Sequence, residues 1–354
     1  KGFQQYANEL SPEWLYHLDP EQTDVLNELF SAALDMISVE GQFQVHFLIG
    51  GPGTGKTSIL LHLLKELSEE NEFAVRMEMS KELRNQIEAS LPMINLQTYT
   101  ECDDERCEIL LDDDPYSILQ VQTKIARMEY NRVKIAIFAF DPMQLASDIT
   151  DSCFDDLVSD SLAQVHRLKT SYRQKENVGK ATTLIADTIA RSTPFLAKEK
   201  IKKFHEEHAK LTAFANELVF PNPMGHVSEP KFSATQADLE REMKRIVSQP
   251  GGLWRHTCPI LVICIDKRLI ELPKWIGKSL GKFDVEHVLL NWIDIQSIKG
   301  LEFQHVIIIL SNVMLSEITS GFRGSGQSVY ESRRLIRIPY SRAKDSLAVL
   351  GLEA

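Results

Sequence analysis

The sequence predicts an α/β fold with two domains, each a parallel sheet flanked by helices. Short apolar runs of strand length alternate with segments of helical character, the pattern of parallel strands joined by crossover helices. The chain of 354 residues is also longer than one average domain and suits two. We place the domains at residues 1–164 and 165–354, the second with a small insertion at about 195–235.

The first domain reads as a regular alternation of strands and helices. In chain order, the expected elements are a strand at Val45–Ile49, a glycine-rich loop, a helix at Ser58–Leu67, a strand at Phe73–Met79, a helix at Lys81–Leu91, and strands at Ile109–Leu111 and Ile135–Phe140. Each of the last two apolar runs is followed by aspartate.

The second domain continues in the same style without repeating the sequence of the first. Its expected elements are a helix at Val178–Arg191, an irregular region near Pro221–Pro230, a helix at Gln236–Val247, a strand at Ile260–Ile265, a helix at Pro273–Leu280, and strands at Val285–Leu290 and Val306–Leu310. We interpret Val306–Leu310 as the last clear strand.

Composition indicates a globular protein with a full core. Hydrophobic residues make up 43% and charged residues 25% of the chain. No apolar run approaches the roughly 20 residues of a membrane-spanning helix, so we expect no membrane partner and a cytoplasmic location, or a nuclear one in a eukaryote. The chain begins with Lys1 and no signal peptide is recognisable, which leaves open that its natural start lies upstream.

The charge balance limits the classes of partner. The chain carries 39 basic and 50 acidic residues, a net charge of −11. A protein that binds nucleic acid through charge alone is normally basic. Non-specific, charge-driven binding is therefore disfavoured, whereas a protein that grips a strand in a narrow local groove is not excluded.

The five cysteines do not form a metal-binding pattern. Cys102 and Cys107 are close in sequence, but no second Cys/His pair with matching spacing follows. Free thiols in a reducing compartment are the favoured interpretation.

A phosphate-binding loop is the most specific motif. Gly50–Thr57 reads Gly-Gly-Pro-Gly-Thr-Gly-Lys-Thr and matches G-x-x-x-x-G-K-[ST] between an apolar strand and a helix. Its glycines let backbone N–H groups face phosphate oxygens, Lys56 would reach the β- and γ-phosphates, and the Thr57 hydroxyl would bind Mg²⁺. The expected nucleotide-binding residues of this segment are Gly51, Gly53, Thr54, Gly55, Lys56, Thr57 and Ser58.

Such a loop requires an acid at the end of a neighbouring strand to hold the magnesium shell. The run Ile109–Asp114 supplies three apolar residues followed by three aspartates. We assign Asp112 to the metal side, together with Thr57, and Asp113 to the attacking water. The alternative is that the three acids form a solvated turn. The acids at Asp103–Glu105 lack a preceding apolar strand and are set aside.

Taken in order, these motifs resemble superfamily 1 helicases of the UvrD/RecD-like group. The loop spelling is similar to the RecD-like branch, and the later block Lys-Gly-Leu-Glu-Phe to the UvrD-like branch. Leu18–Gln22 looks like the Q motif of this family, in which Gln22 would read the adenine edge; otherwise it is a surface residue. Asp112 and Asp113 take the place of the family's Asp-Glu pair. The shorter side chain implies slow hydrolysis, or use of another carboxylate such as Asp114.

Phe140–Gln144 is similar to the family's Gly-Asp-x-x-Gln motif. The resemblance implies that Gln144 senses the γ-phosphate. Phe140 departs from the family's glycine, and an ordinary turn after a strand is the alternative interpretation.

Three blocks in the second half extend the resemblance. Leu168–Gln174 resembles the motif that opens the second domain, so Arg173 would reach the γ-phosphate and Tyr172 would either flank the base or pack in the core. Ile295–Phe303 is close to motif V, which implies nucleotide contacts for Gly300 and Glu302 and strand contacts for Ser297 or Lys299. Ile338–Asp345 resembles motif VI, which makes Arg342 a second arginine at the triphosphate.

The resemblance implies two RecA-like domains that hydrolyse ATP, with Mg²⁺, at the cleft between them while bound to single-stranded nucleic acid, DNA being favoured over RNA. Met79–Lys81 and Tyr99 fall where the family contacts the strand. Only about 30 residues separate Met79 from Asp112, too few for an inserted domain of about 50 residues. We therefore expect a compact motor with weak unwinding of its own and a protein partner such as a nuclease or another effector subunit.

Two other functions remain open from the sequence. One is an ATP-controlled switch or scaffold whose domain closure a partner protein reads, favoured by the acidic balance and by Asp113 and Phe140. The other is a P-loop kinase or GTPase, which would leave the motifs of the second domain unexplained.

Overall fold

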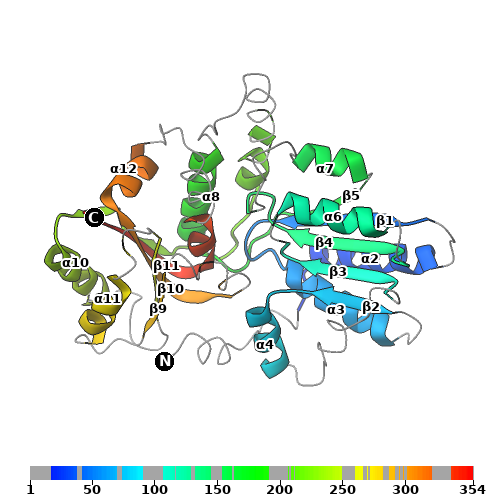
Figure 1. Ribbon diagram of the computed structural model, residues 1–354, viewed down its shortest axis with the longest axis horizontal. Coiled ribbons are helices and arrows are strands. Elements are labelled where there is room, and N and C mark those ends of the chain that lie inside the picture. Colours follow the sequence, from blue (N-terminus) through cyan, green and yellow to red (C-terminus); the bar gives the residue numbers. More distant parts are fainter. Residues whose placement is uncertain are drawn as a thin grey trace. The chain divides into compact units, whose positions relative to one another are not determined.

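The computed structural model (Figure 1) describes most of the chain. The described residues are 17–37, 42–69, 74–90, 107–115, 117–128, 132–144, 154–161, 163–190, 206, 209–210, 212–248, 260–265, 269, 272–281, 287–291, 295, 298, 301–320 and 336–353. Their contacts divide the chain into two units between Thr170 and Ser171.

The first unit is built on a sheet whose described strands number five and are all parallel, in the order β2-β3-β4-β1-β5 (Figure 1). The strands are β1 (Gln44–Gly50), β2 (Val75–Glu78), β3 (Ile109–Asp113), β4 (Ile135–Phe140) and β5 (Gln164–Leu168). Every residue of β3 and β4 is buried, as expected for central strands that helices cover on both faces.

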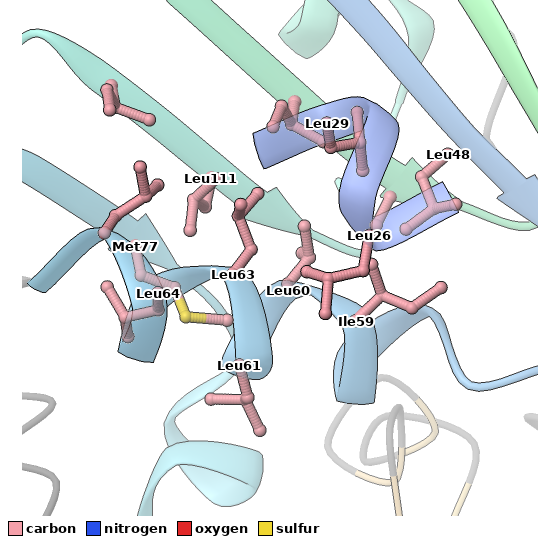
Figure 2. Close-up of a cluster of buried hydrophobic side chains, with 14 of the residues drawn as sticks. Leu26, Leu29, Leu48, Ile59, Leu60, Leu61, Leu63, Leu64, Met77 and Leu111 are labelled. Atoms are coloured by element: carbon pink, nitrogen blue, oxygen red, sulfur yellow. The ribbon is translucent and has the colours of Figure 1, made fainter. Parts of the chain in front are cut away.

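Helices cover both faces of this sheet (Figure 1). They are α2 (Pro20–Ile37), α3 (Lys56–Glu69), α4 (Lys81–Ser90), α6 (Ile118–Met128) and α7 (Phe154–Ser161). On one face, side chains of α2 and α3 such as Leu29 and Leu60 pack with Leu111 of β3 in one buried cluster (Figure 2). On the other face, Phe140 of β4 and Phe154 of α7 meet edge to face at 5.9 Å. Successive strand residues point to opposite faces of the sheet. Whether a residue occupies an odd or an even position in its strand therefore decides which helices its side chain packs against.

The second unit has a sheet of six described strands, again all parallel, in the order β6-β11-β10-β8-β9, with β7 also pairing with β11. The strands are β6 (His226–Val227), β7 (Lys231–Ser233), β8 (Ile260–Cys264), β9 (His287–Asn291), β10 (Phe303–Ser311) and β11 (Ala343–Leu352). The helices are α8 (Glu176–Ala190), α10 (Gln236–Ser248), α11 (Leu272–Gly281) and α12 (Asn312–Ser320). Leu239 of α10, Ile276 of α11 and Ile307 of β10 share one buried cluster. The predicted fold class, two parallel sheets flanked by helices, is confirmed.

Two segments lie elsewhere in the fold than the sequence indicated. Residues 164–168 form β5, which pairs with β1 in the first sheet, although we placed the domain boundary at 164/165. This strand mixes polar and apolar residues (Gln-Val-His-Arg-Leu) and lacks the apolar run by which the other strands are recognised. Residues 226–233, near the end of the predicted insertion at 195–235, supply β6 and β7 to the second sheet.

The prediction that Val306–Leu310 is the last strand was wrong. β11 follows it, is 10 residues long, and pairs with β10 from Phe303↔Ala343 to Ser311↔Leu352. Its first residues, Ala343–Asp345, belong to the block that resembles motif VI and include two charged residues. The start of the strand therefore reads as a motif rather than as an apolar run. This register brings the residues that precede β10 and β11 together at one edge of the second sheet.

Candidate functional site

The loop, the acids and the glutamine singled out from the sequence lie at one edge of the first sheet. Because the strands are parallel, their carboxyl ends share this edge, the usual place for ligands in open α/β sheets. Gly51 begins the loop after β1, Asp113 ends β3, and Gln144 follows β4. We expected the acids on the strand next to β1, but β4 lies between β1 and β3. Gln144 therefore follows the strand that lies between the loop and the acids.

Two glycines of the loop are required by its backbone. Gly53 and Gly55 have φ angles of 72° and 87°, a left-handed region that suits glycine. A Cβ atom on Gly55 would lie 2.2 Å from Nε2 of Gln22. A Cβ atom on Gly50 would lie 2.3 Å from Oγ1 of Thr54. Gly55 thus combines a left-handed backbone with a close neighbour, whereas Gly50 is restricted by the close neighbour alone.

Lys56 lies at the first position of α3 and folds over the loop. Its Nζ donates to the carbonyl oxygens of Gly50 and Gly51 at 2.9 and 3.0 Å. The Thr54 hydroxyl donates to the Gly51 carbonyl at 3.0 Å. The first N–H groups of a helix have no acceptor within the helix, so an ammonium group and backbone donors converge where the loop meets α3. This arrangement suits a polyphosphate.

Gln22 holds the loop from α2. Asp19 and Gln22 cap this helix reciprocally: the Asp19 N–H donates to Gln22 Oε1 at 3.0 Å and the Gln22 N–H donates to Asp19 Oδ1 at 2.9 Å. The Gln22 Nε2 group donates to the Thr54 carbonyl of the loop at 3.0 Å. These partners fix which end of the amide is oxygen. The interpretation of Gln22 as a surface residue was wrong, because its side chain is buried; reading of the adenine edge stays a prediction.

Replacing Gln22 by alanine is expected to loosen the loop and to lower the free energy of unfolding by about 1–3 kcal/mol, since the Thr54 carbonyl loses a buried donor. If Gln22 only supports the loop, the variant should raise KM for ATP and GTP by the same factor. A change in the ratio of the two KM values would instead assign it to the adenine edge. Steady-state turnover with both nucleotides and denaturant unfolding make the measurement.

The acid beside the loop is Asp113 rather than Asp112. The Thr57 hydroxyl donates to Asp113 Oδ2 at 2.8 Å. Asp113 shares its strand face with Leu111, the face that α3 covers. Burial raises the pKa of Asp113, the Thr57 hydrogen bond and the charge of Lys56 oppose this, and the neighbouring aspartates add to it. The Asp113 carboxylate, rather than that of Asp112, thus lies next to the Thr57 hydroxyl. This geometry favours Asp113 for the metal side, and the metal-side role of either acid stays a prediction.

Asp112 points to the opposite face and joins an ion-pair cluster. Lys124 of α6 donates to Asp112 Oδ2 at 2.6 Å and to Glu78 Oε2 of β2 at 2.5 Å. Burial raises the pKa of Asp112 to about 6 although the charge of Lys124 opposes this. Burial alone would lower the pKa of Lys124, but the two carboxylates raise it. Lys124 thus joins the ends of β2 and β3 through its contacts with Glu78 and Asp112.

Asp114 turns the chain out of β3. Its φ angle of 65° lies in the left-handed region, which aspartate tolerates better than most residues. Its N–H donates to the Ala139 carbonyl of β4 at 2.7 Å. Asp114 thus lies just past the end of β3, next to the acid that contacts Thr57.

Phe140 and Gln144 lie in different surroundings: Gln144 belongs to a turn after β4, and Phe140 packs in the core. Asp141 Oδ1 accepts from the Met143 N–H at 2.9 Å and the Gln144 N–H donates to the Asp141 carbonyl at 2.8 Å, so this segment is a tight turn that presents Gln144 just past β4. Gln144 is nearly buried. Phe140 packs against Phe47 at 5.6 Å on the α7 face. The departure from glycine is thus explained by core packing.

Replacing Phe140 by alanine is expected to lower the free energy of unfolding of the first unit by about 3–5 kcal/mol, because a fully buried aromatic side chain is lost. Denaturant unfolding followed by circular dichroism measures the change. Leu119→Ala is the matched control, since Leu119 is exposed on α6 and its loss should leave stability nearly unchanged. A Phe140→Ala variant as stable as this control would contradict the packing explanation.

In the second unit, Arg173 and Glu302 form an ion pair. The Arg173 Nε–H donates to Glu302 Oε1 at 2.6 Å, and Lys344 Nζ lies 3.3 Å from Glu302 Oε2. These three residues come from the three blocks that resemble helicase motifs. Tyr172, next to Arg173, is exposed, so its alternative as a core residue was wrong.

Arg342 is buried within its own unit. Its Nε donates to the Ser341 hydroxyl at 3.0 Å and its Nη1 to the Leu301 carbonyl at 3.4 Å. The residue precedes β11, and the second bond links the two blocks that precede β10 and β11. Its predicted role at a triphosphate stays a prediction.

Gln174 is a connecting residue to which the sequence assigned no role. Its Nε2 lies 2.9 Å from the Thr182 hydroxyl of α8, and 3.1 and 3.2 Å from the carbonyls of Tyr340 and Ala343. The Thr182 hydroxyl lies 3.1 Å from the Tyr340 carbonyl. The block around Arg173 is thus fixed to the block around Arg342 by a buried network. Only its place at the end of a motif-like block distinguishes this glutamine in the sequence.

Several predicted positions fall outside the described residues. They are Gly300, Ser297, Lys299 and Tyr99. Within the described part of the chain, Cys107 and Cys264 are buried free thiols, and no group of three or more His, Cys, Asp or Glu side chains is arranged to hold a metal ion. None of the helices in that part is both long and apolar enough to cross a membrane.

No protein-family model matches the chain, and no curated protein matches it either. Solved structures do. An arterivirus nonstructural protein 10, a helicase, is 15% identical with a TM-score of 0.42, covering 92% of this chain and 61% of its own. The Pif1 helicase from Candida albicans is 13% identical with a TM-score of 0.39, covering 94% of each chain. Domain III of the replication initiation protein DnaA from Thermotoga maritima is 20% identical with a TM-score of 0.29, covering 58% of this chain and 86% of its own. The chain thus spans less than two thirds of the arterivirus helicase.

Proposed function

We propose that the chain is an ATP-dependent nucleic-acid motor that hydrolyses ATP to ADP and phosphate while bound to a single strand, DNA being favoured over RNA. The observation that carries the proposal is the hydrogen bond between Thr57 and Asp113, next to a loop on which Lys56 is already folded. A hydroxyl, a carboxylate and an ammonium group at the end of a glycine-rich loop are the groups that a nucleoside triphosphate and its metal ion require.

Thr57 and Asp113 are the residues that would hold Mg²⁺. Both supply the hard oxygen ligands that this ion prefers, and their oxygens are 2.8 Å apart. When bound, Mg²⁺ neutralises charge on the β- and γ-phosphates. Lys56 would bind the same phosphates, and the backbone N–H groups of the loop would orient them.

Asp114 and Gln144 are the proposed partners of the attacking water. Asp114 directly follows Asp113, and Gln144 follows the strand between the acids and the loop. A carboxylate accepts the proton of a water, and an amide can donate to an oxygen while it accepts from another group.

Arg173 is the proposed cation of the second unit at the γ-phosphate. A planar guanidinium group stabilises charge that spreads over phosphate oxygens. Arg342 would have to leave the Ser341 hydroxyl and the Leu301 carbonyl to act in the same way. We therefore assign the direct role to Arg173 and a supporting role to Arg342.

The test is ATP turnover with and without single-stranded DNA and RNA. A motor is expected to hydrolyse ATP faster when a strand is bound. Equal turnover with and without strands would contradict it and favour the second candidate, an ATP-controlled switch that acts through a partner such as a nuclease. The observation that favours the switch is that Arg342 is buried and bound to the Ser341 hydroxyl and the Leu301 carbonyl of its own unit.

A further inference from the structure

Glu302 is shared by two cations in the second unit. One carboxylate oxygen accepts from Arg173 Nε at 2.6 Å and the other lies 3.3 Å from Lys344 Nζ. Glu302 immediately precedes β10, Lys344 lies at the start of β11, and the pairing Phe303↔Ala343 brings the two together. The Glu302 side chain retains 15% of its exposure and that of Arg173 12%. The pair is therefore largely protected from water. A charge-assisted hydrogen bond is stronger in such a protected place than in water.

The geometry of the pair orients the guanidinium group. Among the described residues, Arg173 bonds a side chain through Nε alone. A guanidinium group has five N–H donors, and four of them belong to its two terminal nitrogens. A carboxylate that holds Nε fixes the plane of the group and leaves its terminal fork for an anion.

Lys344 keeps the carboxylate in place. Burial alone would raise the pKa of Glu302, but the charges and hydrogen bonds of Arg173 and Lys344 lower it below its ordinary value. Lys344 binds the oxygen that Arg173 does not use. The carboxylate is thus held from both sides and cannot rotate away without breaking a second ion pair.

We propose that Glu302 is a positioning residue for Arg173: it holds the guanidinium group by Nε so that the terminal fork faces a phosphate. This inference rests on the proposed function and deepens it. The helicase resemblance implies that Glu302 itself contacts the nucleotide, whereas here it acts through an arginine.

A double-mutant cycle on ATP turnover tests the proposal. Arg173→Ala is expected to lower kcat about 100-fold or more. Glu302→Ala should lower kcat about 10-fold with little change in KM. The double variant should be no slower than Arg173→Ala alone, because Glu302 has no arginine left to orient. Glu302→Gln should retain part of the activity, since its amide oxygen can still accept from Nε. Glu229→Ala is the matched control, since Glu229 is 90% exposed in the same unit.

A second readout requires no nucleotide. The ¹⁵Nε–H resonance of Arg173 can be assigned by its absence in Arg173→Lys. Its proton should exchange slowly with solvent in the unmodified protein and rapidly in Glu302→Ala. Multiplying effects in the cycle, or an Arg173 resonance unchanged by Glu302→Ala, would overturn the positioning role while leaving the proposed function intact. An unmodified protein without ATP turnover would overturn the proposed function, and the positioning role would fall with it.

Discussion

Replacing Lys56 by alanine is expected to lower ATP turnover about 100- to 1,000-fold, the usual loss when one preorganised charge or donor at the reacting phosphate is removed. The ammonium group lies on the loop carbonyls of Gly50 and Gly51, so it is already near the place where the β- and γ-phosphates would bind. Because the positive charge acts most strongly as negative charge develops in the transition state, kcat should fall more than KM rises. Steady-state phosphate release at saturating Mg²⁺ makes the measurement.

The control for this variant lies on the same helix. Lys65 is exposed at the far end of α3, and Lys65→Ala removes the same charge without approaching the loop. Its turnover should match that of the unmodified protein. A Lys56→Ala variant as active as Lys65→Ala would exclude the loop as the site of hydrolysis and with it the proposed motor.

Local signals explain why the loop and most elements of the fold were predictable. Gly53 and Gly55 of the loop are required by the backbone at that place, and the strand and helix beside the loop have continuous apolar or periodic patterns. β4 was predicted at its observed bounds, Ile135–Phe140, because a fully buried parallel strand is apolar at every residue. β5 and β11 escaped for the opposite reason, since polar or motif-like residues interrupt them.

The roles of the three acids depend on information that the sequence does not contain. Ile109, Leu110 and Leu111 are all apolar because helices cover both faces of the sheet. Their pattern therefore does not reveal which face of the sheet α3 covers. For this reason the sequence does not show whether Asp112 or Asp113 points toward α3. In the structure, two contacts with distant parts of the chain show the face on which each acid lies: Thr57 contacts Asp113, and Lys124 contacts Asp112.

The contacts within the second unit could not be predicted from the sequence either, because their partners are far apart along the chain. Arg173 and Glu302 are separated by 129 positions, and only the pairing of β10 with β11 brings Lys344 to the same carboxylate. The resemblance picked out Arg173 and Glu302 as separate ligands of a nucleotide and assigned no role to Lys344. It did not indicate that they bind one another.

Replacing Asp113 by asparagine is expected to lower ATP turnover about 100- to 1,000-fold, because the amide cannot supply the negative charge beside Thr57 that a magnesium ion requires. The same change at Asp112 should act differently. Asp112→Asn breaks a buried ion pair with Lys124 and is expected to cost about 3–5 kcal/mol of stability, while turnover per folded molecule changes little. Titration of turnover with Mg²⁺, together with denaturant unfolding of both variants, separates the two effects.

This contrast tests the structural reassignment of the acids, since Asp112 and Asp113 are adjacent, chemically identical and both buried. If Asp113→Asn lowered ATP turnover less than Asp112→Asn did, the metal-side role would return to Asp112, and the interpretation drawn from the geometry of β3 would be contradicted. Asp114→Asn completes the set. If Asp114 accepts the proton of the attacking water, this variant should lose turnover without a shift in its Mg²⁺ dependence, whereas Asp113→Asn should show both. The three successive acids at the end of β3 would then have three separate functions: support of the sheet edge by Asp112, binding of the metal ion by Asp113, and activation of water by Asp114.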